Sequence, residues 1–424
     1  MGRKKVINLV VFLGIMLIGI LVQIYSDYFW GNRSDVKEKD EVIRIWTIHG
    51  DIEEALNVAL DDYKLKHPNI NFEVTVYKNE VYQTAINNAL LTDSLPDMFF
   101  MWGYSKLKRF VDAGVIQEIT NIVKEQNISQ QVMEGGLDAF TYDDKIYALP
   151  LYGWKATLFC NRDMFAKYEL KYPETYDELI KVMDQFKEQG VVPIITGAKE
   201  GWLSSLYYMS LVQGEGPGNT IYKAVTDKNL FLGNQFSQAA KKLEQFTKGG
   251  YWKKNHMEYD AYNAIHLFSQ EEAAMLYYGS WGSSFMESES SKVRGKIDVI
   301  PFPNGNKKEG IGGYVDTFAI NKYGEIPQSK ELMEMYTEVV GSVSDISVKN
   351  NGSGLPVYKD QMIDSTKFPI LYRCFTDTAK QKLYPAYDQI MSEELSSEYY
   401  KLINELVSGE KSSQDFVNGL AQSD

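Results

Sequence analysis

The amino-acid sequence predicts an α/β protein of two domains that follows a single transmembrane helix. Short apolar runs alternate with helical patterns along most of the chain, an order typical of βαβ units and parallel sheets. The part from Val42 to Asp424 is long enough for two domains of ordinary size. An apolar run near the amino terminus approaches the ~20 residues that a helix needs to cross a bilayer.

The amino-terminal residues favour an uncleaved signal anchor. Arg3, Lys4 and Lys5 precede the apolar run from Val6 to Ile24, and positive charge before a span predicts that the body of the protein faces outside. A cleaved signal peptide is the alternative, but no small-residue cleavage site follows the run. We therefore expect residues 1–24 to anchor the protein in the cell membrane. Residues 25–41 are polar and charged, as in a linker.

Three strands and three helices are predicted between Val42 and Gly114. Each strand is a short apolar run, and each helix has apolar residues spaced three or four apart. The expected strands are Val42–Ile48, Ile70–Tyr77 and Asp97–Met101; the expected helices are one with an apolar face from Ala55 to Tyr63, then Tyr82–Leu91 and Ser105–Ala113.

The middle of the chain continues the alternation of strands and helices. Turn residues, a capping-box pattern and glycines mark the ends of its elements. In chain order we expect a hairpin over Tyr142–Leu151 that turns at Asp143 and Asp144, a strand from Trp154, a helix from Asp163, a helix capped by Thr175 and Glu178 that ends at Gly190, a strand over Val191–Thr196 and a helix over Ser237–Lys248.

The stretch from Phe268 to Lys322 is the most informative part of the chain. It reads FSQEEAAMLYYGSW up to Trp281, which predicts a helix end and then a strand over Ala273–Tyr278 that stops at Gly279. Two further apolar strands follow, Ile297–Pro303 and Gly312–Lys322, and helices dominate beyond them. A large aromatic residue just beyond the carboxyl end of a strand is typical of a ligand crevice in α/β proteins, although Trp281 in a core is the alternative.

Composition limits the kinds of partner. The net charge is −13, and the first 24 residues hold three basic residues and no acid, so the rest of the chain carries −16. A body so acidic is expected to bind neither nucleic acid nor anionic lipid surfaces. There are two cysteines, Cys160 and Cys374. We expect Cys160 to be a buried thiol within a strand, with a disulfide between the two as the alternative.

The sequence carries no recognisable catalytic motif. Its four histidines have no metal-ligand spacing, its cysteines have no zinc spacing, and it has neither a Walker A loop nor a G-x-S-x-G motif. We therefore predict no enzyme activity and no cofactor. A glycoside hydrolase stays open, because the two carboxylates that it needs face each other in space rather than in sequence.

The stretch that leads to Trp281 resembles the carbohydrate-type extracellular solute-binding proteins of ABC importers. In that family an F-x-x-G-x-A-A-M run leads to G-x-W, and Phe268, Ala273–Met275, Gly279 and Trp281 match it here. Glu271 stands where the family usually has glycine. Residues 91–120 similarly resemble the P-D-(apolar)₃–W block of the family.

The resemblance implies two lobes with a ligand cleft between them, as in periplasmic binding proteins. The first lobe would hold residues 42–152 and 294–340, and the second residues 153–293 and 341–424. The ligand would be an oligosaccharide, and the partner would be the transmembrane permease of an ABC importer. The family's usual lipid tether is excluded, since no cysteine precedes Cys160. A tethered sugar sensor is the alternative to a transport receptor.

The resemblance also supplies candidate ligand contacts. Aromatic faces pack on the apolar faces of pyranose rings, and polar side chains bind the hydroxyls. The aromatic candidates are Trp281, Trp202, Trp102, Tyr152 and, with a core position favoured, Trp154. The polar or strand-associated candidates are His49, Asp51, Glu80, Gly313, Asp316 and Arg373. For Asp51 the alternative is the N-cap of a helix, and for Asp316 it is a structural hydrogen bond.

Overall fold

The computed structural model describes residues 41–376 and 381–423. The predicted anchor, residues 1–24, lies outside these residues, as does all of the predicted linker except Glu41. Within the described ranges, no helix has both the length and the apolar character needed to cross a bilayer.

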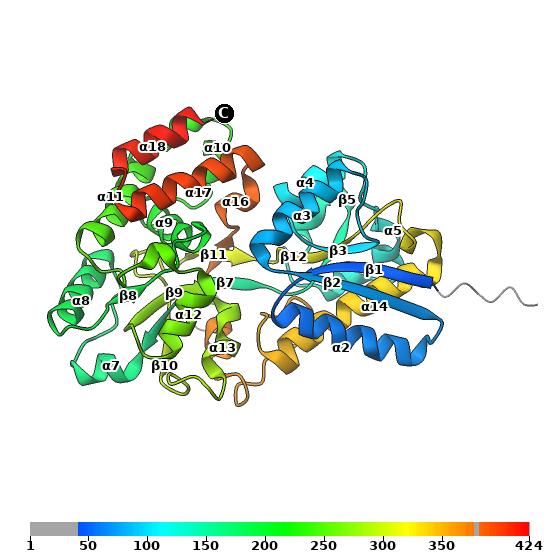
Figure 1. The fold of residues 1–424 in the computed structure, drawn as a ribbon, viewed down its shortest axis with the longest axis horizontal. Helices are drawn as coiled ribbons and strands as arrows, with labels where there is room; N and C mark the ends of the chain where they lie inside the picture. Colours follow the sequence, from blue (N-terminus) through cyan, green and yellow to red (C-terminus); the bar gives the residue numbers. More distant parts are fainter. Residues whose placement is uncertain (1–40, 377–380, 424) are drawn as a thin grey trace, which may run out of the picture.

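The described chain forms two lobes, each built on its own sheet (Figure 1). The sheet of the first lobe has the order β2-β1-β3-β12-β6. Its strands β1 and β2 are parallel, as are β1 and β3, whereas β12 runs antiparallel to both β3 and β6. The bounds are β1 Glu41–Ile48, β2 Ile70–Tyr77, β3 Met98–Trp102, β6 Ala148–Pro150 and β12 Asp316–Ile320.

Helices cover the first sheet and bury its apolar side chains. Helix α2 turns the predicted face toward the sheet, with Ala55, Leu56 and Tyr63 all buried. Helix α14 packs beside α2, although it lies far away in sequence (Figure 1). The helices here are α2 Asp51–Lys66, α3 Asn79–Leu91, α4 Ser105–Asp112, α5 Thr120–Glu125, α6 Ile128–Gln131 and α14 Lys330–Asp345.

The second lobe holds a sheet of order β13-β11-β7-β9-β8, with β10 also paired to β7. Strand β7 is buried at every residue and runs antiparallel to β9, β10 and β11. The bounds are β7 Trp154–Asn161, β8 Ile194–Ile195, β9 Met275–Gly279, β10 Ile297–Ile300, β11 Glu309–Gly313 and β13 Lys382–Tyr384. The expectation of parallel sheets therefore holds for β1 with β2 and β3, for β8 with β9 and for β11 with β13. Strands β6, β7, β10 and β12 pair only in antiparallel fashion.

The helices of the second lobe include α9, which is buried along most of its length, and the carboxyl-terminal pair α17 and α18. Helix α16 lies between this pair and the first lobe (Figure 1). The bounds are α7 Arg162–Lys167, α8 Tyr176–Glu188, α9 Trp202–Glu215, α10 Thr220–Ala224, α11 Asn234–Lys248, α12 Ala261–Ser269, α13 Ser283–Glu287, α15 Pro369–Thr376, α16 Tyr387–Ile390, α17 Glu393–Ser408 and α18 Ser413–Gln422.

Local signals in the sequence account for several of these boundaries. The Thr175 side chain accepts a hydrogen bond from the Glu178 backbone, and the Glu178 side chain accepts one from the Thr175 backbone. The predicted capping box of α8 is therefore confirmed. Asp143 and Asp144 have φ of 49° and 60°, the left-handed pair expected for a two-residue turn between β4 (Thr141–Tyr142) and β5 (Lys145–Ile146).

The chain passes between the lobes at β6–β7, at β11–β12 and after α14. The predicted return to the first lobe at Arg294 is too early. Strands β10 and β11 pair with β7 in the second sheet, and only β12, from Asp316, belongs to the first. The last crossing is later than residue 341, since the π-helix Ile346–Asn351 still packs on α2.

Both cysteines are buried and neither forms a disulfide. Cys160 is the partner of Met275 in the pairing of β7 with β9 and is 0% exposed. The prediction of a buried thiol at Cys160 is confirmed.

Candidate functional site

A cleft of about 540 Å³ lies between the two lobes. Its lining comes from the β1–α2 loop, β3, α3 and α4 of the first lobe and from β9, α9, α12, α13, α16 and α17 of the second. Eight of the sequence candidates line it, namely His49, Asp51, Trp102, Tyr152, Trp154, Trp202, Trp281 and Asp316.

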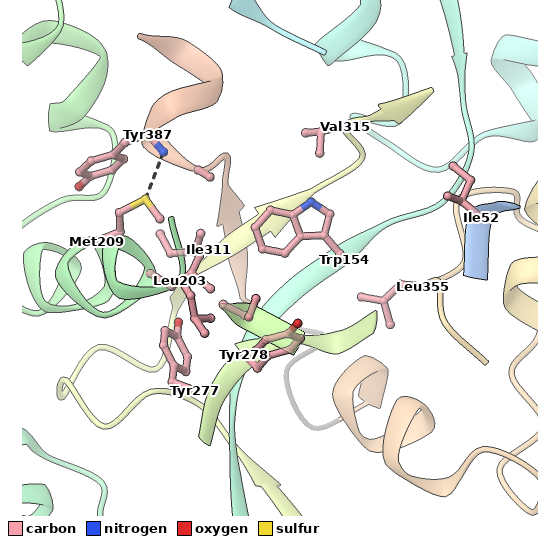
Figure 2. Packing of buried hydrophobic residues seen from close by; sticks show 14 of the residues in the cluster. Ile52, Trp154, Leu203, Met209, Tyr277, Tyr278, Ile311, Val315, Leu355 and Tyr387 are labelled. Atoms are coloured by element: carbon pink, nitrogen blue, oxygen red, sulfur yellow. Dashed lines mark hydrogen bonds between the residues drawn. The ribbon is translucent and has the colours of Figure 1, made fainter. Parts of the chain in front are cut away.

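Aromatic side chains form the second-lobe wall of this cleft. The Trp281 ring lies 5.1 Å from that of Trp154, 6.1 Å from that of Trp202 and 5.5 Å from that of Tyr278, measured between centroids. The ring planes are inclined by 73°, 43° and 59°, the tilted and edge-to-face geometry that aromatic clusters favour. Figure 2 shows Trp154 between the second-lobe core around Leu203 and the first-lobe residue Ile52.

Local backbone geometry turns two of these indoles into the cleft. Gly279 ends β9, and a Cβ atom at this position would overlap the ring of Trp281, so only glycine lets the indole fold back over the strand end. Gly201 has φ of 81° and precedes Trp202, the first residue of α9. Trp202 and Trp281 are both half-buried, whereas Trp154 is 5% exposed and belongs largely to the core.

Trp102 supplies an aromatic surface from the first lobe. It is the last residue of β3, and Asp316 of β12 lies opposite it in the sheet. The edge-to-face contact with Phe100, at 4.9 Å and 87°, fixes the plane of the indole. The cleft therefore has aromatic surfaces on both sides.

Asp316 and Tyr152 lie at the crossings between the lobes. Burial raises the pKa of the Asp316 carboxyl to about 7. Burial also holds the pKa of Tyr152 well above its ordinary value, and the Asp316 and Asp51 charges act in the same direction. A carboxyl group that titrates near neutral pH can donate a hydrogen bond to a ligand hydroxyl when protonated and accept one from it when ionised.

Asp51 is the first residue of α2 rather than its N-cap, a position that Gly50 occupies. Its Oδ2 accepts a hydrogen bond of 2.9 Å from Ser284 Oγ of the second lobe. Burial raises the pKa of Asp51, while the bonds from Ser284 and Ser353 act against that rise. His49 is more exposed, and its ring pairs with Glu53 at 2.7 Å.

Two of the described candidates, Gly313 and Arg373, do not line the cleft. Gly313 ends β11, where it pairs with Trp154. Arg373 belongs to α15, and its Nη1 donates to Asp298 Oδ1 at 2.6 Å and to the Ile297 carbonyl at 3.0 Å. Its role there is structural, because the guanidinium joins α15 to β10. Glu80 is in the first turn of α3, and its side chain lies outside the described part of the structure.

The carboxyl-terminal helices bring to the cleft a polar group that the sequence did not predict. Asp388 of α16 lines it, and burial raises the pKa of this carboxyl, against the nearby Lys106 charge and the hydrogen bond with Tyr400. Lys106 pairs with Glu393 of α17 across the lobes at 3.6 Å. No local motif marks these residues, since α16 and α4 meet only through the tertiary fold.

The arrangement suits a neutral, hydroxyl-rich ligand. Aromatic side chains of both lobes offer faces for apolar ring surfaces, and Asp51, Asp316 and Asp388 offer hydrogen-bonding groups around them. Two lobes joined by crossing strands, with such a cleft between them, define a ligand-binding protein of the two-lobed receptor class.

The chain belongs to the bacterial extracellular solute-binding protein family, whose sequence model matches residues 49–338. An ABC transporter extracellular-binding protein of Pyrococcus horikoshii is 25% identical over 75% of this chain and 72% of its own length. The multiple sugar-binding protein of Streptococcus mutans is 22% identical over 66% of each chain. A solved structure from a study of xylan utilisation by Caldanaerobius polysaccharolyticus is 26% identical, with a TM-score of 0.84, and covers 90% of this chain and 99% of its own.

Proposed function

We propose that this protein is an extracellular receptor that binds an oligosaccharide and delivers it to an ABC importer. The aromatic cleft between the lobes is the observation that carries the proposal, because Trp281, Trp202 and Trp102 flank a space lined by carboxyl groups. The sugar-binding relative and the structure from a xylan-utilising bacterium support the same ligand class.

Calorimetric titration of residues 41–424 against a panel of neutral oligosaccharides tests this proposal. The expected result is saturable binding of at least one glycan family with micromolar or lower Kd, in the range of specific small-ligand sites. If amino acids, peptides or free metal ions bind while every glycan fails, the oligosaccharide assignment is wrong.

The same proposal includes the membrane and the permease as partners. Residues 1–24 would hold the receptor at the outer face of the cell membrane, and the closed receptor would dock on the transmembrane subunits of the importer. Intact mass of the membrane-extracted protein tests the anchor, since a mass that begins after Ile24 would show that the segment is removed.

A glycoside-acting enzyme is the second candidate. The observation in its favour is Asp316, whose raised pKa of about 7 is typical of a general acid and which lines the cleft with Asp51 and Asp388. Incubation with the oligosaccharide that binds, followed by mass analysis of the sugar, separates the two. We expect the ligand to be recovered intact.

A further inference from the structure

A second pocket, also of about 540 Å³, lies beside the cleft. It is formed by α3 and α4 of the first lobe together with the segment around the start of α17 in the second. Five residues line both spaces: Gln83, Asn87, Trp102, Lys106 and Glu393. Because the same side chains line both, we interpret the second pocket as a continuation of the cleft.

The second pocket differs from the cleft in its chemistry. Trp102 and Phe110 are its only aromatic residues among those described, and Phe110 is 2% exposed and forms part of the floor. Charged side chains are the most numerous kind instead, and the outermost are accessible to solvent, with Lys108 51% and Asp112 60% exposed. The pocket is therefore a more polar outlet of the cleft.

The junction between the two spaces is held by weak polar contacts. Glu393 of the second lobe is approached by Lys106 at 3.6 Å, by Arg109 at 3.8 Å and by Asn87 Nδ2 at 3.5 Å, all from the first lobe. The Glu393 side chain is 37% exposed. Partly exposed contacts of this length are readily exchanged for contacts with ligand hydroxyls.

Resting on the proposed function, we propose that this second pocket is a subsite for the sugar units of a chain that extends beyond the rings held in the aromatic cleft. Trp102 lines both spaces, so it serves as the ring surface at the boundary between them. The receptor then takes linear oligosaccharides whose end leaves the cleft between α4 and α17, and longer chains bind more tightly than short ones.

The test is a chain-length series measured with a variant that fills the pocket. Lys108 lines the second pocket and not the cleft, and its side chain is half exposed, so Lys108→Trp reduces the space with little effect on folding. Lys124→Trp, on the exposed side of α5, is the matched control. The probes are xylo- and malto-oligosaccharides of two to six units, with raffinose and stachyose as a further pair.

For the wild type and Lys124→Trp we expect affinity to rise about tenfold or more between the shortest chain that binds and the longest, as one good subsite supplies. For Lys108→Trp we expect that rise to fall below about threefold, with the affinity for the shortest chain unchanged. Glu393→Gln, which removes the charge at the junction, should also reduce the gain from chain length.

The outcomes separate this inference from the proposed function. If oligosaccharides bind but Lys108→Trp leaves the dependence on length unchanged, the second pocket is not a subsite, while the receptor function stands. If Lys108→Trp weakens all lengths equally, the subsite is equally overturned. If no series binds to the wild type at any length, both the inference and the oligosaccharide function fail.

Discussion

The side chain of Trp281 is only partly covered by neighbouring residues of the protein. Its ring contacts Trp154, Trp202 and Tyr278, and it is half-buried and also lines the cleft. Such a residue can contribute both to packing and to ligand binding. Single substitutions can measure how much it contributes to stability and how much to affinity.

Trp281→Ala should weaken sugar binding more than it weakens folding. Truncation of a central aromatic anchor costs about 2 kcal/mol or more, which corresponds to a loss of affinity of about thirtyfold or greater. Gly279→Ala should also lower affinity, because the added methyl group displaces the indole. Calorimetric titration and thermal melting of the same preparations measure both quantities.

Trp252→Ala is the control for a tryptophan that serves only the core. Trp252 is 7% exposed, contacts Tyr207 and Phe246, and does not line the cleft. Its loss should cost roughly 3–5 kcal/mol of stability while the folded fraction keeps its affinity. If Trp281→Ala behaves in the same way as Trp252→Ala, Trp281 belongs to the core.

Asp316 should make stability depend on pH. Burial raises its pKa from 3.8 to about 7, so between about pH 4 and pH 7 the folded protein holds a proton that the unfolded chain releases. The contribution of this group to the free energy of unfolding is therefore fully present below about pH 4. It decreases as pH rises from about 4 through the folded-state pKa of about 7. Asp316→Asn should remove that decrease, which we place at about 1–2 kcal/mol, because Asp316 is only half-buried and lines the cleft.

Denaturant unfolding at a series of pH values measures the effect. Glu287→Gln is a useful comparison, because burial also raises the pKa of Glu287 to about 7 but this residue does not line the cleft. Both variants should flatten the pH dependence, and only Asp316→Asn should change ligand affinity. Parallel pH curves for wild type and Asp316→Asn would refute the assignment of the shift to Asp316.

At the scale of elements, local patterns predicted the secondary structure well. Strand β2 has the predicted bounds Ile70–Tyr77, and the capping box of α8 is present, because both depend on neighbouring residues in the chain. Strand β8 is only Ile194–Ile195, shorter than the predicted Val191–Thr196. Its length is set by the pairing with β9, which a local pattern does not encode.

The turn between α12 and β9 provides a test at this scale. Glu271 has φ of 63°, in the left-handed region that favours glycine. Glu271→Gly should relieve roughly 1 kcal/mol of backbone strain, while the loss of the partly exposed ion pair with Lys296 removes less. The gain is measured as a shift of the denaturant midpoint.

Glu272→Gly is the matched control, since Glu272 also pairs with a lysine, Lys253, but is not among the described residues with positive φ. We expect Glu271→Gly to be the more stable of the two variants by about 1–2 kcal/mol. Equal stabilities would show that the turn carries no strain at Glu271.

At the scale of the whole molecule, fewer of the residues that line the cleft could be predicted from the sequence. The aromatic candidates that line the cleft each lie at or near the end of a strand or open a helix, and a position of that kind is visible in the sequence. Asp388 and Glu393 were missed because helices α16 and α17 reach the first lobe only after the chain has folded. Arg373 was misplaced for the same reason, since its partner Asp298 is distant in sequence.

The two lobes contact each other on both sides of the cleft. On one side, Tyr262 donates to the His49 carbonyl at 3.3 Å and Ser284 donates to Asp51 at 2.9 Å. On the other, Ser105 Oγ lies 2.6 Å from the Gln389 carbonyl and 2.8 Å from that of Met391. Hydrogen bonds of this kind can be exchanged for bonds with water, so we infer that the lobes separate without ligand and that a ligand between them favours closure.

Small-angle X-ray scattering should therefore report a smaller radius of gyration with saturating sugar than without it. Ser105→Ala should destabilise the closed form, since it removes one hydrogen bond between the lobes, a loss of about 0.5–1.5 kcal/mol. The apparent affinity should then fall by about threefold to tenfold. Ser237→Ala, which removes a hydroxyl bonded to Asn234 within α11, should change neither quantity. Scattering that is the same with and without bound sugar would instead describe a rigid site in which the contacts across the cleft are permanent.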